Sequence, residues 1–382
     1  MYSWSRELIG PLGEQLMTND VHEKLAHHLA TPGMGLPPTR ALVDLLKEIF
    51  TNQEAEIVML LPTTDVPLKP VGLVDLQGRT ALDAQMLADI LDDLAERGLI
   101  YSGKLESGES GYALHQAGFG FPQSFFWKGE DTPRARKMTK LVLKYFNRTV
   151  TREAFGGRKT KAYRYIPINQ SLNPEVQAIL PHDRMEMVLE AADRFAVAHC
   201  PCRVEADLMD RGCGHPLEVC LKFDEMADFL VERGLGKEIT RAAARATVRQ
   251  SAEAGLVHFV DNAAGKVKHN CNCCGCACWN VGSIRRRKIP RDDLMAVYFT
   301  RKTLPDQCTG CGACVDICPV QAIELNADVA VVDQQWCIGC GVCTLRCEFD
   351  ALQICYREDQ NQQVPTDFER LHTAIRAENK QG

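Results

Sequence analysis

The chain has 382 residues, of which 45% are hydrophobic and 25% are charged, and its formal net charge is −6. This length allows two or three domains with buried cores, and the charge is ordinary for a soluble protein. No apolar run is long enough to span a membrane, and the first residues lack the pattern of a secretion signal. The 18 cysteines all follow residue 199 in closely spaced groups, which argues against a disulfide framework and favours a cytoplasmic metalloprotein.

The cysteine-free residues 1–125 have the pattern of helix, turn, helix and hairpin. Apolar residues recur at helical spacing in 20–50 and 82–97, and 101–114 alternates like a hairpin with a glycine-rich tip. This layout is similar to that of winged-helix domains, which suggests DNA as a partner. The helix that would read the DNA, 82–97, carries five acidic residues and one arginine, so its charge would repel phosphate. We therefore expect a winged-helix-like domain that docks onto protein, with nucleic acid disfavoured.

Residues 126–181 are expected to form a basic linker that contains a helix. Between Arg134 and Arg164 there are eleven lysines and arginines and one acid, and several of these cations share a helix face. Three interpretations stay open: a solvated linker, a surface for single-stranded nucleic acid suggested by interleaved aromatic residues, and an electrostatic docking surface. We favour docking, because residues 305–355 carry seven acids against one arginine and can complement the basic helix, as can an acidic redox partner.

Residues 182–290 contain nine cysteines in two tight groups, separated by helices expected near 223–233 and 240–254. A single buried cysteine is common, but a C-x-C-C-x-C-x-C run is difficult to explain as core packing. Because two adjacent thiols rarely bind the same ion, we expect that Cys273 and Cys274 serve different centres or that one of them is spare. We predict a mostly helical domain that binds metal through the following residues: Cys200, Cys202, Cys213, Cys220, Cys271, Cys273, Cys274, Cys276 and Cys278.

The chemistry of these nine thiols stays open between three alternatives. They suffice for one or two further [4Fe-4S] clusters, or for one cluster and a zinc ion, and the triplet Cys273-Cys274-Gly275 suggests a catalytic CCG-type cluster site. The arrangement looks like that of multicluster ferredoxin-type proteins with an extra cysteine-rich domain. The spacing does not assign partners. Four nearby histidines are expected to be hydrogen-bonding or surface residues rather than ligands: His199, His215, His258 and His269.

Residues 295–357 contain two C-x2-C-x2-C-x3-C runs, and the second repeats the first at an offset of 29 residues. Three cysteines of such a run can bind three corners of an iron–sulfur cube, and the fourth ligand comes from the other run. Glycines between the cysteines let the backbone turn and bring N–H groups close to sulfur. We therefore predict one [4Fe-4S] cluster on Cys308, Cys311, Cys314 and Cys347, and a second on Cys337, Cys340, Cys343 and Cys318.

These runs, with Pro319 after the fourth cysteine, resemble the bacterial dicluster ferredoxin module over residues 304–356. One departure is Glu348, which stands where that module has a second proline. Paired zinc sites are the alternative, and the short spacing disfavours them. Cys355 is expected to be a buried structural thiol, and the polar tail 358–382 to form one short helix.

The expected fold class is α+β with several domains: winged-helix-like, basic linker, helical cysteine-rich, ferredoxin-like and tail. The sequence has no nucleophile triad, phosphate loop or dinucleotide fingerprint, so we predict an electron-transfer protein or oxidoreductase subunit without a substrate of its own. It would relay single low-potential electrons between a flavoprotein or small ferredoxin and a terminal reductase. Two alternatives stay open: a redox-sensing winged-helix transcription regulator, and a catalytic iron–sulfur reductase with its site within residues 200–278.

Overall fold

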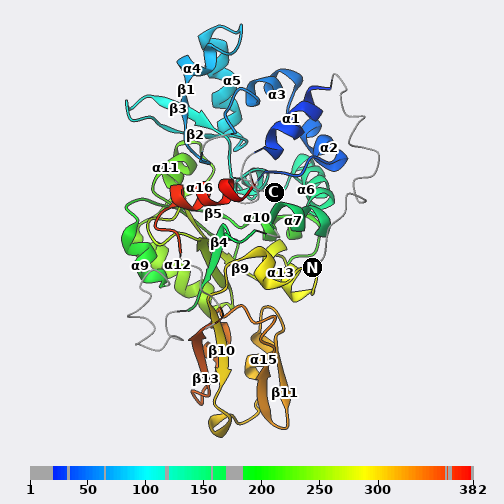
Figure 1. The fold of residues 1–382 in the computed structure, drawn as a ribbon, viewed down its shortest axis with the longest axis vertical. Coiled ribbons are helices and arrows are strands. Elements are labelled where there is room, and N and C mark those ends of the chain that lie inside the picture. Colours follow the sequence, from blue (N-terminus) through cyan, green and yellow to red (C-terminus); the bar gives the residue numbers. More distant parts are fainter. Residues whose placement is uncertain are drawn as a thin grey trace.

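The computed structural model describes residues 20–31, 35–63, 66–116, 120–155, 158–168, 184–357, 359 and 364–379. They form three parts along the long axis of the molecule (Figure 1): helices and a small sheet at one end, a larger sheet with helices in the centre, and two ribbons of strands at the other end. No helix in the described part of the chain is long and apolar enough to cross a membrane. Expectations for residues 1–19, 169–183 and 380–382 lie outside the described residues.

The N-terminal part consists of helices whose starts are fixed by polar side chains. Asp20, Thr39 and Asp83 each accept a hydrogen bond from a backbone N–H in the first turn of a helix, and Thr51 forms a capping box with Glu54. A three-stranded sheet with the order β1-β3-β2 packs beside these helices. The elements are α1 (Val21–Ala30), α2 (Arg40–Ile49), α3 (Asn52–Val58), β1 (Val71–Gly72), α4 (Leu73–Gln77), α5 (Ala84–Glu96), β2 (Tyr101–Lys104) and β3 (Ser110–Ala113).

The acidic helix α5 docks onto the central part of the same chain. Arg233, which follows α11 (Glu225–Glu232), contacts Asp92 at 2.6 Å and Glu96 at 4.0 Å. Nearby, the ring of Tyr101 in β2 lies 5.2 Å from the ring of Phe229 in α11, measured between centroids. Some of the acids that argue against DNA binding therefore serve an internal contact.

The helix expected in the basic segment is present, and it packs on the parts of the chain that precede and follow it. On α6, Lys137 pairs with Glu48 at 2.6 Å and Lys144 pairs with Asp44 at 2.9 Å, and both acids belong to α2. These two lysines therefore pair within the chain, and not with the acidic segment 305–355, which was one of the two partners expected for a docking surface. Charge composition could not distinguish the two partners, because both offer carboxylates. The elements are η1 (Gln123–Phe126), α6 (Pro133–Tyr145), α7 (Arg148–Phe155) and β4 (Tyr163–Ile166).

A six-stranded sheet forms the centre of the molecule, with the strand order β4-β8-β9-β6-β5-β7 and antiparallel pairing throughout. The prediction of a mostly helical domain is wrong at its centre, although the helices expected near 223–233 and 240–254 are confirmed as α11 and α12. The strands are short, and β9 consists of alternating polar residues and cysteines, so no apolar period indicated a sheet. The elements are α9 (Met185–Ala191), β5 (Phe195–His199), α10 (Pro201–Leu208), β6 (Glu218–Phe223), α11, β7 (Lys237–Glu238), α12 (Arg241–Glu253), β8 (Val257–Asp261), β9 (His269–Cys273), α13 (Trp279–Arg285) and α14 (Arg291–Leu294).

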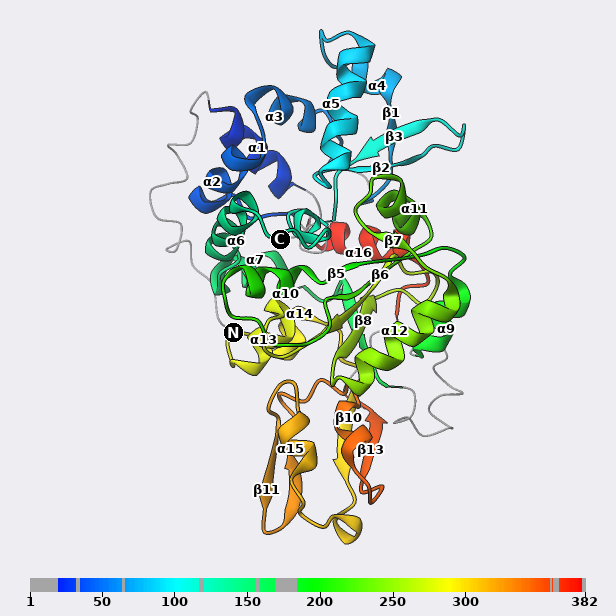
Figure 2. The same ribbon diagram turned by 180° about the vertical axis from the view of Figure 1, so that it is seen from behind.

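Helices cover both faces of this sheet. Alternate residues of β5 divide between two apolar cores: Phe195 and Val197 pack with α9 and α12, whereas Ala196 and Ala198 pack with α10, α11 and the N-terminal helices. Figure 2 shows α9 and α12 together on one side of the strands. The sheet is therefore the common support of the N-terminal part and of the cysteines on β6 and β9.

The small domain at the far end of the molecule contains both C-x2-C-x2-C-x3-C runs (Figure 2). Strand β10 pairs with β13, and β11 pairs with β12. Gly312 and Gly341 occupy equivalent places in the two runs, and each immediately precedes a short helix. Their φ angles are +79° and +74°, which lie in the left-handed region that favours glycine. The elements are β10 (Phe299–Thr303), η4 (Pro305–Gln307), α15 (Ala313–Ile317), β11 (Ile323–Asn326), β12 (Val329–Val332), η5 (Val342–Arg346) and β13 (Leu352–Tyr356).

The tail folds back onto the centre of the molecule. The short helix expected in it is confirmed as α16 (Phe368–Asn379), in which Leu371 and Ile375 are fully buried. The carboxylate of Glu378 accepts hydrogen bonds from the backbone N–H and the hydroxyl of Thr160. The C-terminal helix is therefore part of the core and not a solvated tail.

Candidate metal centres

The eight cysteines of the small domain surround two separate cavities. Each cavity receives three cysteines from one run and the fourth from the other run, so the structure groups them into the two predicted sets. We name the cavity nearer the central sheet the inner site and the other the outer site. The inner site has Cys318, Cys337, Cys340 and Cys343, and the outer site has Cys308, Cys311, Cys314 and Cys347.

The inner site is almost closed to solvent, because its four cysteines are between 7% and 9% exposed. Burial raises the pKa of the Cys340 and Cys343 thiols, since it disfavours the thiolate form. The backbone N–H of Ala322 donates a hydrogen bond to Sγ of Cys318 at 3.3 Å. Four thiolates in such a place need a cationic centre to offset the cost of their charge, which fits the binding of iron.

The outer site is more accessible. Cys311 is exposed, and Cys308 accepts a hydrogen bond from the backbone N–H of Ala330 at 3.4 Å, which lowers the pKa of its thiol. Leu325 and Phe349 also line this site, and they are 46% and 48% exposed. The outer site therefore combines accessible sulfur with exposed apolar surface.

Arg301 of β10 supplies a buried positive charge to both sites. It lines the inner site and is 1% exposed. In the outer site, two backbone N–H groups lower the pKa of the Cys308 thiol, and the positive charge of Arg301 lowers it further by electrostatic attraction. Its Nη2 donates to Thr303 at 2.9 Å, but its Nε and Nη1 have no hydrogen-bond partner among the described residues. A buried cation with unused donors fits an anionic cluster beside it.

We expect Arg301→Gln to lower the reduction potentials of clusters in the small domain by on the order of 50 mV, because a reduced cluster carries one more negative charge that the arginine stabilises. A redox titration followed by electron paramagnetic resonance would measure the change. Arg301→Lys keeps the charge and is the matched control. Equal potentials in the wild-type protein and the glutamine variant would contradict the assigned role.

Six of the nine cysteines of the central part surround a third cavity, here named the six-thiol group. They come from the start of α10, from β6, from β9 and from the start of α13, so four separate elements build the group. Trp127, Lys222 and Trp279 complete the walls. Hydrogen bonds from the Cys202 and Cys273 thiols lower the pKa of Cys278, and backbone N–H groups at the start of α13 lower it further. The six are Cys200, Cys202, Cys220, Cys271, Cys273 and Cys278.

The remaining three cysteines form a separate three-thiol group. The Sγ atoms of Cys213, Cys274 and Cys276 all lie within 4.8 Å of one another, and those of Cys213 and Cys274 are 3.9 Å apart. Cys273 faces the six-thiol group and Cys274 the three-thiol group, so the structure separates the two adjacent cysteines as the sequence analysis expected.

Two charged residues that the sequence analysis did not select lie among these thiols. Arg203 is 1% exposed, and its charge is attracted to Cys200, Cys273 and Cys274. Its Nε and Nη2 have no hydrogen-bond partner among the described residues, which fits thiolates on both sides of it. Burial, together with Cys200, raises the pKa of Glu205 to about 8. The run Cys-x-Cys-Arg was visible in the sequence, but only the fold shows that the arginine is buried.

The loop that carries the three-thiol group touches the inner site. A Cβ atom on Gly275 would lie 1.9 Å from the carbonyl oxygen of Pro319, which follows the inner-site ligand Cys318. The buried side chain of Tyr165 is close to both the six-thiol group and the inner site. Burial raises the pKa of its hydroxyl, and so do Cys278 and Cys273 of the six-thiol group and Cys340 of the inner site. The central thiols and the inner site are therefore neighbours.

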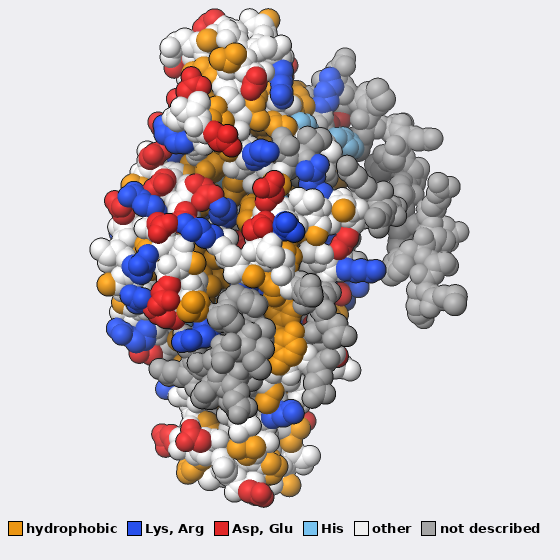
Figure 3. Space-filling model, turned by 60° about the vertical axis from the view of Figure 1, so that its left-hand side comes forward, with side chains coloured by type: hydrophobic (Ala, Val, Ile, Leu, Met, Phe, Trp, Pro, Cys, Tyr) orange, Lys and Arg blue, Asp and Glu red, His pale blue; other side chains and the backbone are white. Residues whose placement is uncertain are grey.

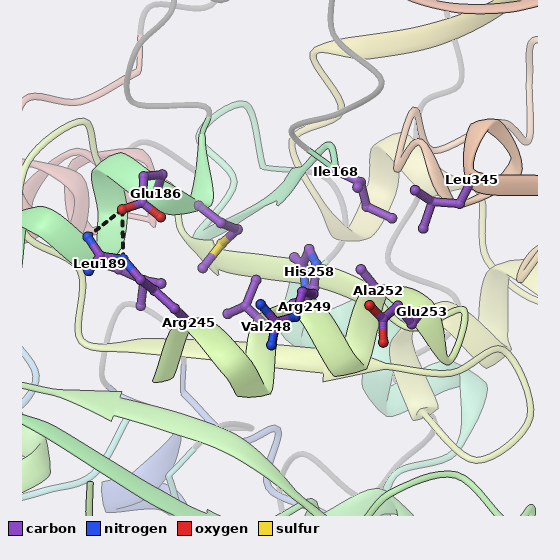
Figure 4. Close-up of a pocket in the computed structure, with 11 residues that line it drawn as sticks. Ile168, Glu186, Leu189, Arg245, Val248, Arg249, Ala252, Glu253, His258 and Leu345 are labelled. Carbon is purple, nitrogen blue, oxygen red and sulfur yellow. Dashed lines mark hydrogen bonds and ion pairs between the residues drawn. The ribbon is translucent and has the colours of Figure 1, made fainter. Parts of the chain in front are cut away.

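An apolar pocket of about 250 Å³ lies between α9, α12 and the small domain (Figure 4). Leu345 of η5 borders it, and the guanidinium of Arg245 donates to Glu186 at 2.8 Å near its other end. His258 also lines the pocket, and its Nδ1 lies 2.5 Å from Oδ1 of Asn272, which lines the six-thiol cavity. The pocket is therefore linked by one hydrogen bond to the cysteine cavity.

The histidines near the central cysteines hydrogen-bond as predicted in three of four cases. Nδ1 of His199 lies 3.1 Å from the carbonyl oxygen of Trp127, His258 contacts Asn272, and His269 lies 3.3 Å from the buried carboxylate of Asp261. His215 is partly exposed. Cys355, on β13, is also partly exposed, so the expected buried thiol is only half-buried.

Comparisons with known proteins agree with the small domain. Residues 307–351 match the family described as "4Fe-4S dicluster domain". A stretch of 30 residues is 63% identical to a protein described as "Probable ferredoxin" from Methanosarcina thermophila, and this stretch is 8% of the present chain and 52% of that protein. The chain thus spans about half the length of this relative, and no solved structure matches. The C-terminal part is therefore an iron–sulfur-binding domain of the ferredoxin type, attached to a larger body that contains a further cluster of cysteines.

Proposed function

We propose that this protein relays single electrons through iron–sulfur clusters from the outer site, by way of the inner site, to a metal centre in the six-thiol group. The observation that carries the proposal is that Cys273 and Cys278 of the six-thiol group lie in the same buried core as the inner-site cysteines. The contact of Gly275 with Pro319 supports it, because Gly275 lies in the loop that joins Cys273 to Cys278. The outer site holds a [4Fe-4S] cluster on Cys308, Cys311, Cys314 and Cys347, and the inner site a second on Cys318, Cys337, Cys340 and Cys343.

The six-thiol group holds a further iron–sulfur cluster in this proposal. Four thiolates satisfy one cube, and six thiols with the buried cations Lys222 and Arg203 nearby offer both ligands and charge compensation. A bound cluster would supply one-electron chemistry. The residues of this chain hold it, exclude water through Trp127 and Trp279, and set its potential through charge.

The partners in this proposal are redox proteins of the cytoplasm: a flavoprotein or small ferredoxin on one side and a reductase on the other. The outer site supports this, because exposed Leu325 and Phe349 line the cavity next to exposed Cys311. The order α3, β1, α4, α5, β2, β3 supports a winged-helix-like N-terminal domain that contacts protein. A DNA-binding regulator is disfavoured, because α5 is acidic and Figure 3 shows acidic and basic side chains interspersed on the face that it draws.

The pocket beside α12 favours a second candidate, a catalytic iron–sulfur reductase. It is apolar, borders the small domain at Leu345, and reaches the six-thiol group through His258 and Asn272. A small substrate in this pocket would lie next to the electron path. A change in the spectrum of one cluster on addition of a substrate would favour this candidate.

Iron and acid-labile sulfide counted per chain, in protein prepared without oxygen, test the main proposal. About twelve irons are expected, four for each of the three centres. About eight irons would restrict clusters to the small domain and overturn the proposed central cluster. Colourless, iron-free but folded protein would overturn the electron-transfer function altogether.

A further inference from the structure

We propose that the three-thiol group is a mononuclear metal site of the zinc type, with three thiolate ligands and a fourth position open to solvent. The site is separate from every iron–sulfur cluster described above, and the inference does not depend on the proposed electron transfer. Its ligands are Cys213, from the segment after α10, and Cys274 and Cys276, from the segment after β9.

The distances between the sulfur atoms distinguish one ion from a cube. With zinc–sulfur bonds of about 2.3 Å and tetrahedral angles, two thiolates on one ion lie about 3.8 Å apart. The Sγ atoms of Cys213 and Cys274 are 3.9 Å apart, and all three lie within 4.8 Å. Thiolates on two corners of a cube are held farther apart, because each bonds outward from its own iron.

The surroundings supply the charge and hydrogen bonds that such a site needs. The N–H of Ala277 donates to Sγ of Cys274 at 3.4 Å, an interaction that orients a thiolate ligand. Three thiolates and one divalent cation leave a net charge of about −1. The buried guanidinium of Arg203 lies beside Cys274 and is attracted to its thiolate, so it balances this charge.

The fourth position faces solvent. No other histidine, cysteine or carboxylate of the described residues lies close enough to join the three sulfur atoms, and Cys276 is exposed. Zinc sites with three protein ligands and one open position bind water or an exchangeable ligand there. The site is therefore expected to take up a small donor molecule such as imidazole.

The test is metal analysis of protein with its clusters in place, in the wild type and in Cys213→Ser and Cys276→Ser, with Cys355→Ser as the matched control. We expect about one zinc per chain in the wild type and in the control. In the two site variants the affinity for zinc should fall at least tenfold, whereas the iron content and the cluster spectrum should not change. Because Cys276 is exposed, its replacement should not disturb folding.

Replacement of the zinc by Co²⁺ gives a second readout, because a tetrahedral cobalt thiolate site has a visible spectrum that imidazole will change if the fourth position is open. Wild-type protein without zinc, zinc retained in both variants, or a cobalt spectrum insensitive to imidazole would each overturn the proposal. A fall in iron in Cys213→Ser would instead assign this thiol to a cluster. The electron-transfer proposal fails on a different measurement, the iron count of the wild type.

Discussion

Cys340→Ser is expected to remove the inner cluster and to interrupt the electron path while leaving the outer cluster in place. Cys340 is 8% exposed and lines the inner site with Cys318, Cys337 and Cys343, so no solvent ligand can take its place easily. We expect the iron content to fall by about four atoms per chain. Iron analysis and electron paramagnetic resonance of the reduced protein would measure the loss.

The control for this variant is Cys355→Ser, which changes a thiol in the same domain outside both cavities. It should keep its full iron content. In Cys340→Ser the outer cluster should still accept an electron from a chemical reductant, but the six-thiol centre should no longer be reduced through it. Unchanged iron in Cys340→Ser would show that the inner site does not use this ligand.

The small domain was predictable because its cysteines are grouped locally. Three cysteines of each cavity lie within seven residues of one another, and the fourth comes from the second copy of the same run. The glycines that make this turn, Gly312 and Gly341, have the positive φ that the spacing requires. Both the grouping of the eight cysteines and the ferredoxin type of the domain therefore follow from the sequence.

The central cysteines were not predictable in the same way, because their grouping depends on pairing across the sheet. Cys220 and Cys271 face the same cavity because β6 pairs with β9, and Cys213 meets Cys274 across 61 residues of sequence. Only the separation of Cys273 from Cys274 was accessible, because two adjacent thiols rarely bind the same ion. The division into six and three thiols needed the fold.

Charge patterns did not identify the internal partners of the charged residues. That the acids of α5 disfavour DNA stays a prediction, and the contact of Asp92 with Arg233 was not visible in the sequence. The basic helix was expected to dock onto the ferredoxin-type domain or an acidic redox partner, whereas Lys137 and Lys144 of α6 pair with α2. Long-range ion pairs form where apolar packing brings the elements together, and counting charges does not predict that packing.

Gly275→Ala is expected to separate the central cysteines from the inner site. The added Cβ would lie 1.9 Å from the carbonyl oxygen of Pro319 and 2.9 Å from its carbonyl carbon. Both are backbone atoms, so no change of rotamer can relieve the overlap, and the two loops must move apart. We expect the free energy of unfolding to fall by about 1–3 kcal/mol. Gly78→Ala is the matched control, because its Cβ would meet no atom closer than 3.7 Å.

The effect of this change on function should be larger than its effect on stability. None of the four thiol groups loses a ligand, so iron content should equal that of the wild type, but electrons placed on the inner cluster have farther to travel to the six-thiol centre. We expect slower reduction of the central cluster after rapid mixing with a reductant, and a weaker magnetic interaction between the two reduced clusters. If the Gly275→Ala protein transfers electrons at the wild-type rate, then the contact with Pro319 is not the electron-transfer route. The central thiols must then exchange electrons elsewhere, and the pocket beside His258 is the next region to test.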